Sequence, residues 1–161
     1  MRTLPTNHKV IATFVNQSLP KARNPRNSVW FEGNKLYSYQ SHLATITPDR
    51  VLFINYDLMH YSNTTTAHIS NLRTTAYDLQ TFIVPLTLSE SAVLFWYWDQ
   101  VHELIAKHKR SITRKATYRE KILLTLSTIE AYVDYAEISR TSPEYICKHD
   151  ITAQLFKHQI L

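Results

Sequence analysis

The sequence predicts an α+β protein: a small antiparallel sheet flanked by helices, then an antiparallel helical hairpin and short C-terminal helices. Short apolar runs separated by turn residues fill the first half, and apolar residues at helical spacing fill the second. With 161 residues, 44% of them apolar, the chain is long enough to bury a core. We expect an α+β domain over residues 1–86 and a helical part over residues 87–161, packed as one compact unit.

The first helix is predicted over residues 7–18, with Asn7 or Thr6 as its cap and Pro20 after its end. The polar stretch 21–27 then leads to a hairpin of residues 28–32 and 35–39. Gly33-Asn34 suits the two-residue turn of that hairpin.

Two further extended runs are predicted over residues 43–47 and 51–56, separated by the turn Pro48-Asp49. A second helix follows. Its cap is Ser62, Asn63 or Thr64, and its buried face carries Ile69, Leu72 and Ala76.

The second half predicts two long helices, over about residues 89–109 and 113–138, joined by a few residues. Their apolar positions follow the four-then-three spacing of a packed seam. The seam residues are Leu94, Trp98, Val101 and Ile105 in one helix, and Ile122, Leu126, Ile129 and Val133 in the other. Short helices are predicted to start at Ser142-Pro143 and near Asp150, the last ending near residue 158.

Several classes of function are excluded by what the chain lacks. Gly33 is the only glycine, and phosphate-binding loops of nucleotide enzymes need several. Cys147 is the only cysteine, which excludes an internal disulfide and a cysteine-based zinc site. The start has no signal-peptide-like run, and no apolar run is long enough for a membrane helix. We expect a cytoplasmic protein without cofactor or bound metal.

The strongest functional candidate is a basic cluster at the predicted turn of the helical hairpin, here called the basic tip. The cluster contains seven cations and one glutamate, Glu120, so its net charge is +6, whereas the formal net charge of the whole chain is +5. They are Lys107, Lys109, Arg110, Arg114, Lys115, Arg119 and Lys121. Such a cluster predicts contact with nucleic acid or an acidic partner; a solvated tip that keeps the protein soluble is the alternative.

A second candidate surface combines aromatic and basic residues on and near the predicted β-hairpin. Alternate strand residues share a face, so Tyr37 and Tyr39 are predicted to point together and to stack bases. A face packed under helices or against a partner is the favoured alternative. The surface consists of Arg23, Arg26, Trp30, Lys35, Tyr37 and Tyr39.

The histidines give only a weak signal for metal binding or catalysis. His42, His60 and His68 lie on a predicted turn, a strand end and a helix start, which some folds bring close together. A zinc site would also need a fourth ligand such as Asp57. Structural or exposed histidines are the favoured interpretation. Pairings of His42 with Ser41, or of His60 with Asp57, do not mark a nucleophile, and we expect no enzyme.

Four consecutive aromatic residues, 95–98, surround one predicted long helix on all sides. Packing inside the molecule is the favoured interpretation, and a homodimer through these aromatics is the alternative.

Several short motifs together resemble a bacteriophage and mobile-element family with the pattern "NQS…ARN…FEG..IYSYGSHFPIA…TTA.HI". The resemblance covers about residues 10–138, and the family has no assigned activity. The chain departs from the pattern at Gln40, where the family usually has glycine, and at Leu43-Ala44-Thr45. Its matching segments are Asn16-Gln17-Ser18, Ala22-Arg23-Asn24, Trp30-Phe31-Glu32-Gly33, Leu36-Tyr37-Ser38-Tyr39, Ser41-His42 and Thr65-Thr66-Ala67-His68-Ile69, with Val84-Pro85 before the long helices.

This resemblance implies a phage-encoded accessory protein in the cytoplasm of an infected bacterial host, without giving a mechanism. Together with the basic tip, it leads us to expect a non-enzymatic protein that binds nucleic acid or a nucleoprotein. The alternative is a protein-binding inhibitor of a host process, an anti-defence or host-takeover factor, whose basic tip docks on an acidic host protein.

Overall fold

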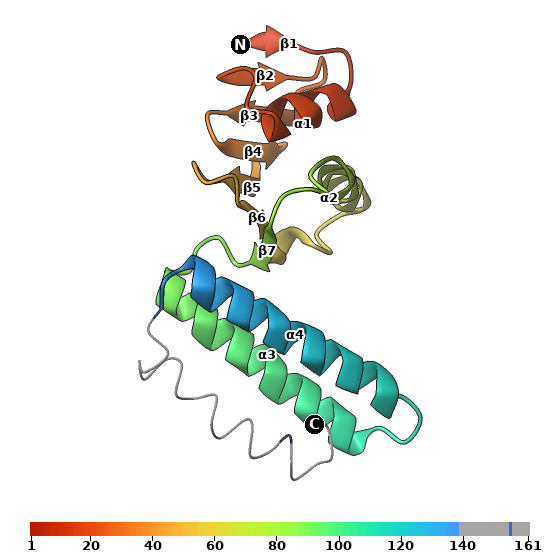
Figure 1. The fold of residues 1–161 in the computed structure, drawn as a ribbon. Helices are drawn as coiled ribbons and strands as arrows, with labels where there is room; N and C mark the ends of the chain where they lie inside the picture. The colour runs from red at the N-terminus through yellow and green to blue at the C-terminus, as the bar shows by residue number, and fades with distance from the viewer. Residues whose placement is uncertain (139–154, 156–161) are drawn as a thin grey trace. The chain divides into compact units, whose positions relative to one another are not determined.

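A computed structural model describes residues 1–138 and Leu155, and its fold is α+β, as the sequence predicts (Figure 1). The chain divides into two compact units, Met1–Thr87 and Leu88–Leu161. The short helices expected from Ser142 and from Asp150 lie outside the described residues.

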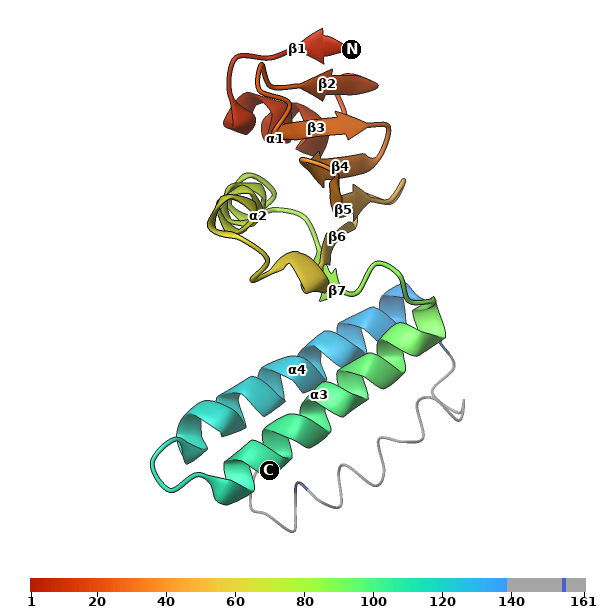
Figure 2. The same cartoon turned by 180° about the vertical axis from the view of Figure 1, so that it is seen from behind.

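The first unit is built on one seven-stranded sheet whose strands follow one another in chain order (Figures 1 and 2). The first and last strand pairs are parallel, and the four pairs between them are antiparallel. The strands are β1 (Arg2–Thr3), β2 (Lys21–Arg23), β3 (Val29–Glu32), β4 (Lys35–Ser38), β5 (Ser41–Ile46), β6 (Leu52–Asn55) and β7 (Thr81–Val84).

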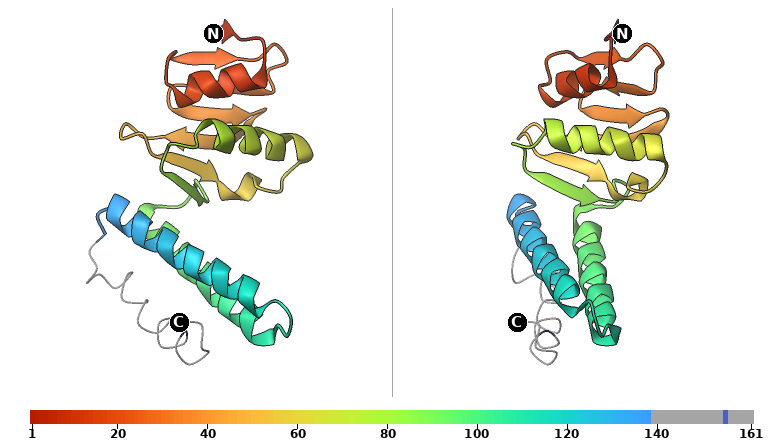
Figure 3. Two further views of the ribbon diagram at one scale, coloured as in Figure 1. Left: turned by 45° about the vertical axis from the view of Figure 1, so that its right-hand side comes forward. Right: turned by 90° about the vertical axis from the view of Figure 1, so that its right-hand side faces the viewer.

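Helices α1 (Asn7–Val15) and α2 (Asn63–Thr75) lie side by side on the same face of this sheet (Figure 3). Each begins at a hydroxyl cap: Thr6 accepts the backbone N–H of Lys9, and Ser62 accepts that of Thr65. A short 3-10 helix, η1 (Tyr56–Leu58), lies between β6 and α2. The core forms where the apolar faces of the two helices meet alternate strand residues, including Phe31, Leu36 and Ile54.

The remaining strand residues point to the opposite face, here called the outer face. Cross-strand partners there are Arg23 and Trp30, Trp30 and Tyr37, and Tyr37 and His42. A bulge between Leu36 and Tyr37 shifts the register of β4 against β5. Because of it, the adjacent residues Leu43 and Ala44 are both fully buried.

The sheet is larger than the sequence predicts, because β1, β2 and β7 were not expected. The stretch 21–27 is polar, and in β2 only Ala22 is buried, so its own sequence carries almost no strand signal. That strand exists because β3 pairs with it along its whole length. Strand β7 pairs in parallel with β6 across the intervening η1 and α2, a pairing that local patterns do not reveal.

The second unit contains the predicted hairpin, helices α3 (Glu90–Arg110) and α4 (Lys115–Tyr135), joined by residues 111–114. Seam residues Leu94, Val101, Ile122 and Ile129 are all fully buried. Between the helices, the rings of Tyr97 and Tyr132 lie 5.8 Å apart. None of the described helices is both long enough and apolar enough to cross a membrane.

Candidate nucleic-acid interface and a buried polar network

The basic tip lies at the turn of the helical hairpin, where the sequence places it. Three of its cations belong to the end of α3, Arg114 belongs to the connection, and three belong to the first turns of α4. Six of the seven are exposed and Lys107 is half-buried, so the cationic groups are accessible to a partner.

Few of these charges are neutralised within the described part of the chain. Lys107 pairs with Glu103, one turn earlier in α3, at 2.6 Å. Arg110 donates a hydrogen bond from Nε to the carbonyl of Ala106 in the same helix. No other tip cation has a carboxylate of the described residues within 4.0 Å. The tip therefore presents unbalanced positive charge.

The two helix ends at the tip differ in how their dipoles interact with this positive charge. Basic residues in the last turn of α3 lie near the negative end of the helix dipole, where they stabilise the helix. At the start of α4, Arg114 and Lys115 lie near the positive end, where cations are unfavourable. The first turn of α4 has no acidic residue, and Arg114 makes no side-chain capping bond. The nearby Ser111 hydroxyl accepts only the backbone N–H of Arg114 itself. Helix stability thus explains the cations of α3 and not those of α4.

His108 connects the tip to the hairpin core. Its side chain is buried on the inner side of α3. Burial lowers the pKa of its imidazole below the usual range, and the positive charges of Lys115 and Arg119 on α4 act in the same direction. The neutral form of His108 is therefore favoured at pH 7, and the pKa of His108 depends on the charge of the basic tip.

The predicted aromatic and basic surface divides into two places. Arg23, Trp30, Tyr37 and Lys35 share the outer face, as expected for neighbouring strands. The rings of Trp30 and Tyr37 stack 4.0 Å apart at an interplanar angle of 6°. Both are half-buried, and helices α1 and α2 cover the other face. The rings therefore do not pack under α1 and α2, and packing of this face against a partner stays a prediction.

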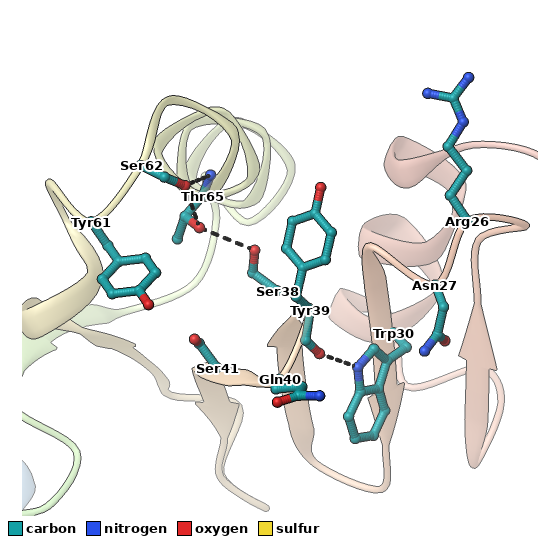
Figure 4. Close-up of a pocket in the computed structure, with 10 residues that line it drawn as sticks. All are labelled: Arg26, Asn27, Trp30, Ser38, Tyr39, Gln40, Ser41, Tyr61, Ser62 and Thr65. Carbon is teal, nitrogen blue, oxygen red and sulfur yellow. Dashed lines mark hydrogen bonds between the residues drawn. The ribbon is translucent and has the colours of Figure 1, made fainter.

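Tyr39 corrects a second expectation, because its ring does not point with that of Tyr37. Strand β4 ends at Ser38, and Tyr39 adopts a left-handed backbone conformation with φ of 53°. This turn breaks the alternation of side chains. The Tyr39 ring consequently lies 6.4 Å from that of His68 on the helical side, pointing away from the Trp30 ring (Figure 4). Arg26 lines the same two hollows as Tyr39, and its side chain extends outward (Figure 4).

A buried network of polar side chains on the helical side was not expected from the sequence. It connects the start of α1, the turn before β3, the end of β4 and the first half of α2. Its hydrogen bonds join Asn24 to Ser28 (2.7 Å) and Asn7 (2.6 Å), Asn7 to His68 (3.0 Å), His68 to Ser38 (2.9 Å), and Ser38 to Thr65 (3.3 Å).

The direction of these hydrogen bonds follows from one backbone group. The N–H of Ser28 donates to Asn24 Oδ1, so Nδ2 of Asn24 is the donor to Oδ1 of Asn7. Asn7 Nδ2 in turn donates to His68 Nε2, which must be unprotonated. The single proton of the neutral His68 ring is therefore on Nδ1 and is donated to the Ser38 hydroxyl. Burial lowers the pKa of His68, which favours this neutral form.

This tautomer argues against catalysis by Ser38 and His68. A general base must present an unprotonated nitrogen to the serine hydroxyl, whereas His68 presents its N–H. Ser38 is also only 1% exposed. The hydrogen bonds of the network instead fix the positions of α1 and α2 on the sheet. Every buried side-chain nitrogen or oxygen atom among the described residues has at least one hydrogen-bond partner.

The three histidines considered as metal ligands do not converge. His42 lies on the outer face, where Nε2 contacts Thr45 Oγ1 at 2.9 Å, while His68 is buried on the opposite side of the sheet. His60 is exposed. The described residues contain no group of three histidine, cysteine or acidic side chains placed to hold a metal.

Most of the four consecutive aromatic residues of α3 pack inside the molecule. Tyr97 and Trp98 are buried, Trp96 is half-buried, and Phe95 is 45% exposed. Tyr132 of α4, in contact with Tyr97, donates its hydroxyl to the carbonyl of Glu90. A homodimer through these aromatics stays a prediction.

Comparison of the chain with protein-family models, with curated proteins and with solved structures finds no match. Assignment of function therefore rests on the geometry of these sites.

Proposed function

We propose that the protein is a non-enzymatic accessory protein of the phage type that binds nucleic acid, or a nucleoprotein, through its basic tip in the host cytoplasm. The charge at the start of α4 is the main support. Natural sequences usually agree with local helix preferences, and departures from them concentrate at functional sites. Arg114 and Lys115 oppose the dipole of α4 without an internal ion pair to offset this cost among the described residues. A polyanion bound at the tip supplies the missing negative charge.

The shape of the tip also suits a phosphate backbone. The cations come from two adjoining helix ends and their short connection, and all but Lys107 are exposed. Arginine and lysine groups presented in this way contact phosphates without reading sequence. We therefore expect binding with weak sequence preference.

An acidic host protein is the second candidate partner, and Ile112 is the observation that favours it. This side chain lies among the tip cations and is 93% exposed. A protein partner would cover it, whereas a phosphate backbone would not need it. An Ile112→Ser variant separates the two partners: it should leave nucleic-acid affinity unchanged and weaken binding to a protein.

The direct test reverses three tip charges with Lys109, Arg110 and Arg114→Glu. Affinity for duplex and single-stranded oligonucleotides, measured by fluorescence anisotropy at fixed salt, should fall at least about tenfold. Each phosphate contact that is lost means that fewer counterions are released on binding. The matched control reverses three exposed cations of the first unit, Arg2, Lys9 and Arg73→Glu, with the same change in net charge.

The control variant should retain most of the wild-type affinity, because only local charge is expected to matter. If the tip variant binds every nucleic acid as tightly as wild type does, the proposal is wrong. Equal losses in the two variants would indicate attraction by overall charge instead of a site. Pull-downs from nuclease-treated host lysate give an independent check, since they retain only a protein partner.

A further inference from the structure

Two hollows flank Tyr39, just beyond the end of β4. The first has a volume of about 630 Å³ and is lined by Trp30, Ser38, Tyr61 and Thr65, among others (Figure 4). The second, of about 550 Å³, lies over Asn7 and Asn24. Arg26 and Tyr39 line both. Each volume is within the range of small-molecule sites.

The charge of these hollows favours an anion. Among the described residues that line them, Arg26 is the only one with an ionised side chain, and no carboxylate is present. Arg26 is exposed and has no ion pair with a described carboxylate. In Figure 4 its side chain extends outward at the rim of the first hollow, on the far side of Tyr39 from Ser38 and Thr65. Its guanidinium is thus available to a phosphate or carboxylate group bound at that rim.

A count of hydroxyl protons gives an independent indication of a ligand. Ser38 and Thr65 are 1% and 2% exposed, and both line the first hollow. Ser62 donates its own proton to Thr65, and His68 donates to Ser38. The single contact between Ser38 and Thr65 uses only one of their two hydroxyl protons. The other has no acceptor among the described residues, so a buried donor remains for a ligand in the hollow.

The walls of the first hollow also present aromatic rings. Tyr39 is 52% exposed and Tyr61 is 69% exposed, and both line it. Exposed tyrosine rings are usual stacking partners of an unstacked base. The floor is held by the hydrogen-bonded network, so the site is preorganised and little conformational freedom is lost on binding.

We propose that the first hollow binds a nucleoside phosphate, with its phosphate group at Arg26, its base against Tyr39, and the spare hydroxyl proton donated to an acceptor atom of the base. The same chemistry is presented by a free mononucleotide and by the terminal nucleotide of a strand. This site does not involve the basic tip and lies in the other unit, so the two proposals can fail separately.

The test titrates the full-length protein with adenosine monophosphate, uridine monophosphate, the corresponding nucleosides and inorganic phosphate, monitored by ligand-observed NMR. A monophosphate should bind at least tenfold more tightly than its nucleoside or than inorganic phosphate. Arg26→Gln should remove the advantage of the monophosphate over the nucleoside. Tyr39→Ser should weaken both nucleoside and monophosphate, whereas the exposed Arg73→Gln is the matched control and should change neither.

Oligonucleotides with and without a 5′ phosphate distinguish the two sources of the ligand. A preference for the phosphorylated strand that Arg26→Gln removes, without measurable binding of the free monophosphates, assigns the site to a strand end. The tip variant Lys109, Arg110 and Arg114→Glu should bind monophosphates as wild type does. Equal affinity for nucleoside and monophosphate, or an Arg26→Gln variant indistinguishable from wild type for every probe, overturns the proposal. Thermal melting confirms that each variant is folded.

Discussion

The buried network of the first unit and the basic tip of the second are both polar, and they differ in whether their groups have partners. In the network, Asn24, Asn7, His68 and Ser38 form a chain of hydrogen bonds that begins at a backbone N–H. At the tip, most cations have no ion pair within the described residues. The network therefore specifies the fold, and the tip is available to a partner.

The starts of the helices show the same difference. Helices α1, α2 and α3 are capped by the hydroxyls of Thr6, Ser62 and Ser89, whereas α4 starts at Arg114 without a side-chain cap. Residues that build the fold follow the rules of helix stability, and the tip cations at the start of α4 depart from them. Changes in the network and at the start of α4 should therefore have opposite consequences for stability.

The largest expected effect is the loss of stability in Asn24→Ala. This change removes the acceptor of two backbone N–H groups, from Ser28 and Val29, and the donor to Asn7. Buried polar groups left unpaired are costly, and we expect the free energy of unfolding to fall by about 3 kcal/mol. Urea unfolding measures it. Asn71→Ala, at an exposed position of α2, is the control and should change stability by less than about 0.5 kcal/mol. Similar values for the two variants would show that the network does not specify the fold.

The next largest effect is expected from acidification, which should weaken the network. Burial lowers the pKa of His68 in the folded state, so its stabilising contribution is complete above the unfolded value of 6.5 and is lost as the pH falls below it. The free energy of unfolding should therefore decrease between about pH 7 and pH 5. His42 and His108, whose pKa values are also lowered, contribute in the same direction.

His68→Gln should make this decrease smaller, because a glutamine does not take up a proton in that range. His60→Gln, at an exposed position, controls for the loss of a histidine. Urea unfolding at several pH values is the measurement. An unaltered pH dependence in His68→Gln would mean that His68 is not the group whose protonation matters.

A smaller effect, of opposite sign, is expected at the tip. Arg114→Asp places a capping carboxylate at the start of α4 and removes an unfavourable cation, so the free energy of unfolding should rise by about 1 kcal/mol. The same variant should bind nucleic acid more weakly. Arg110→Asp, at the end of α3, should instead lower stability slightly. If Arg114→Asp lost both stability and binding, Arg114 would have a structural role.

The helices and the central hairpin could be predicted because their signals are local. Apolar spacing predicted α1 to α4, and Gly33-Asn34 correctly predicted the turn between β3 and β4. Capping residues near Thr6 and Ser62 were correct as well. The position of the basic tip follows from the helical hairpin, so it too was visible in the sequence.

The network and the two hollows could not be predicted, because each of their residues is ordinary in its own segment. Asn24, Ser38 and His68 lie on a turn, a strand end and a helix, and only tertiary packing brings them together. Tyr39 was assigned to the wrong side because a left-handed residue ends the alternation of β4.

Titration of His108 by NMR, with and without a bound oligonucleotide, tests the central claim most directly. The positive charges of Lys115 and Arg119 contribute to its lowered pKa. A polyanion at the basic tip would neutralise them, so the pKa of His108 should rise on binding. An oligonucleotide that saturates the protein and leaves this pKa unchanged would contradict the proposal that the tip is where nucleic acid binds.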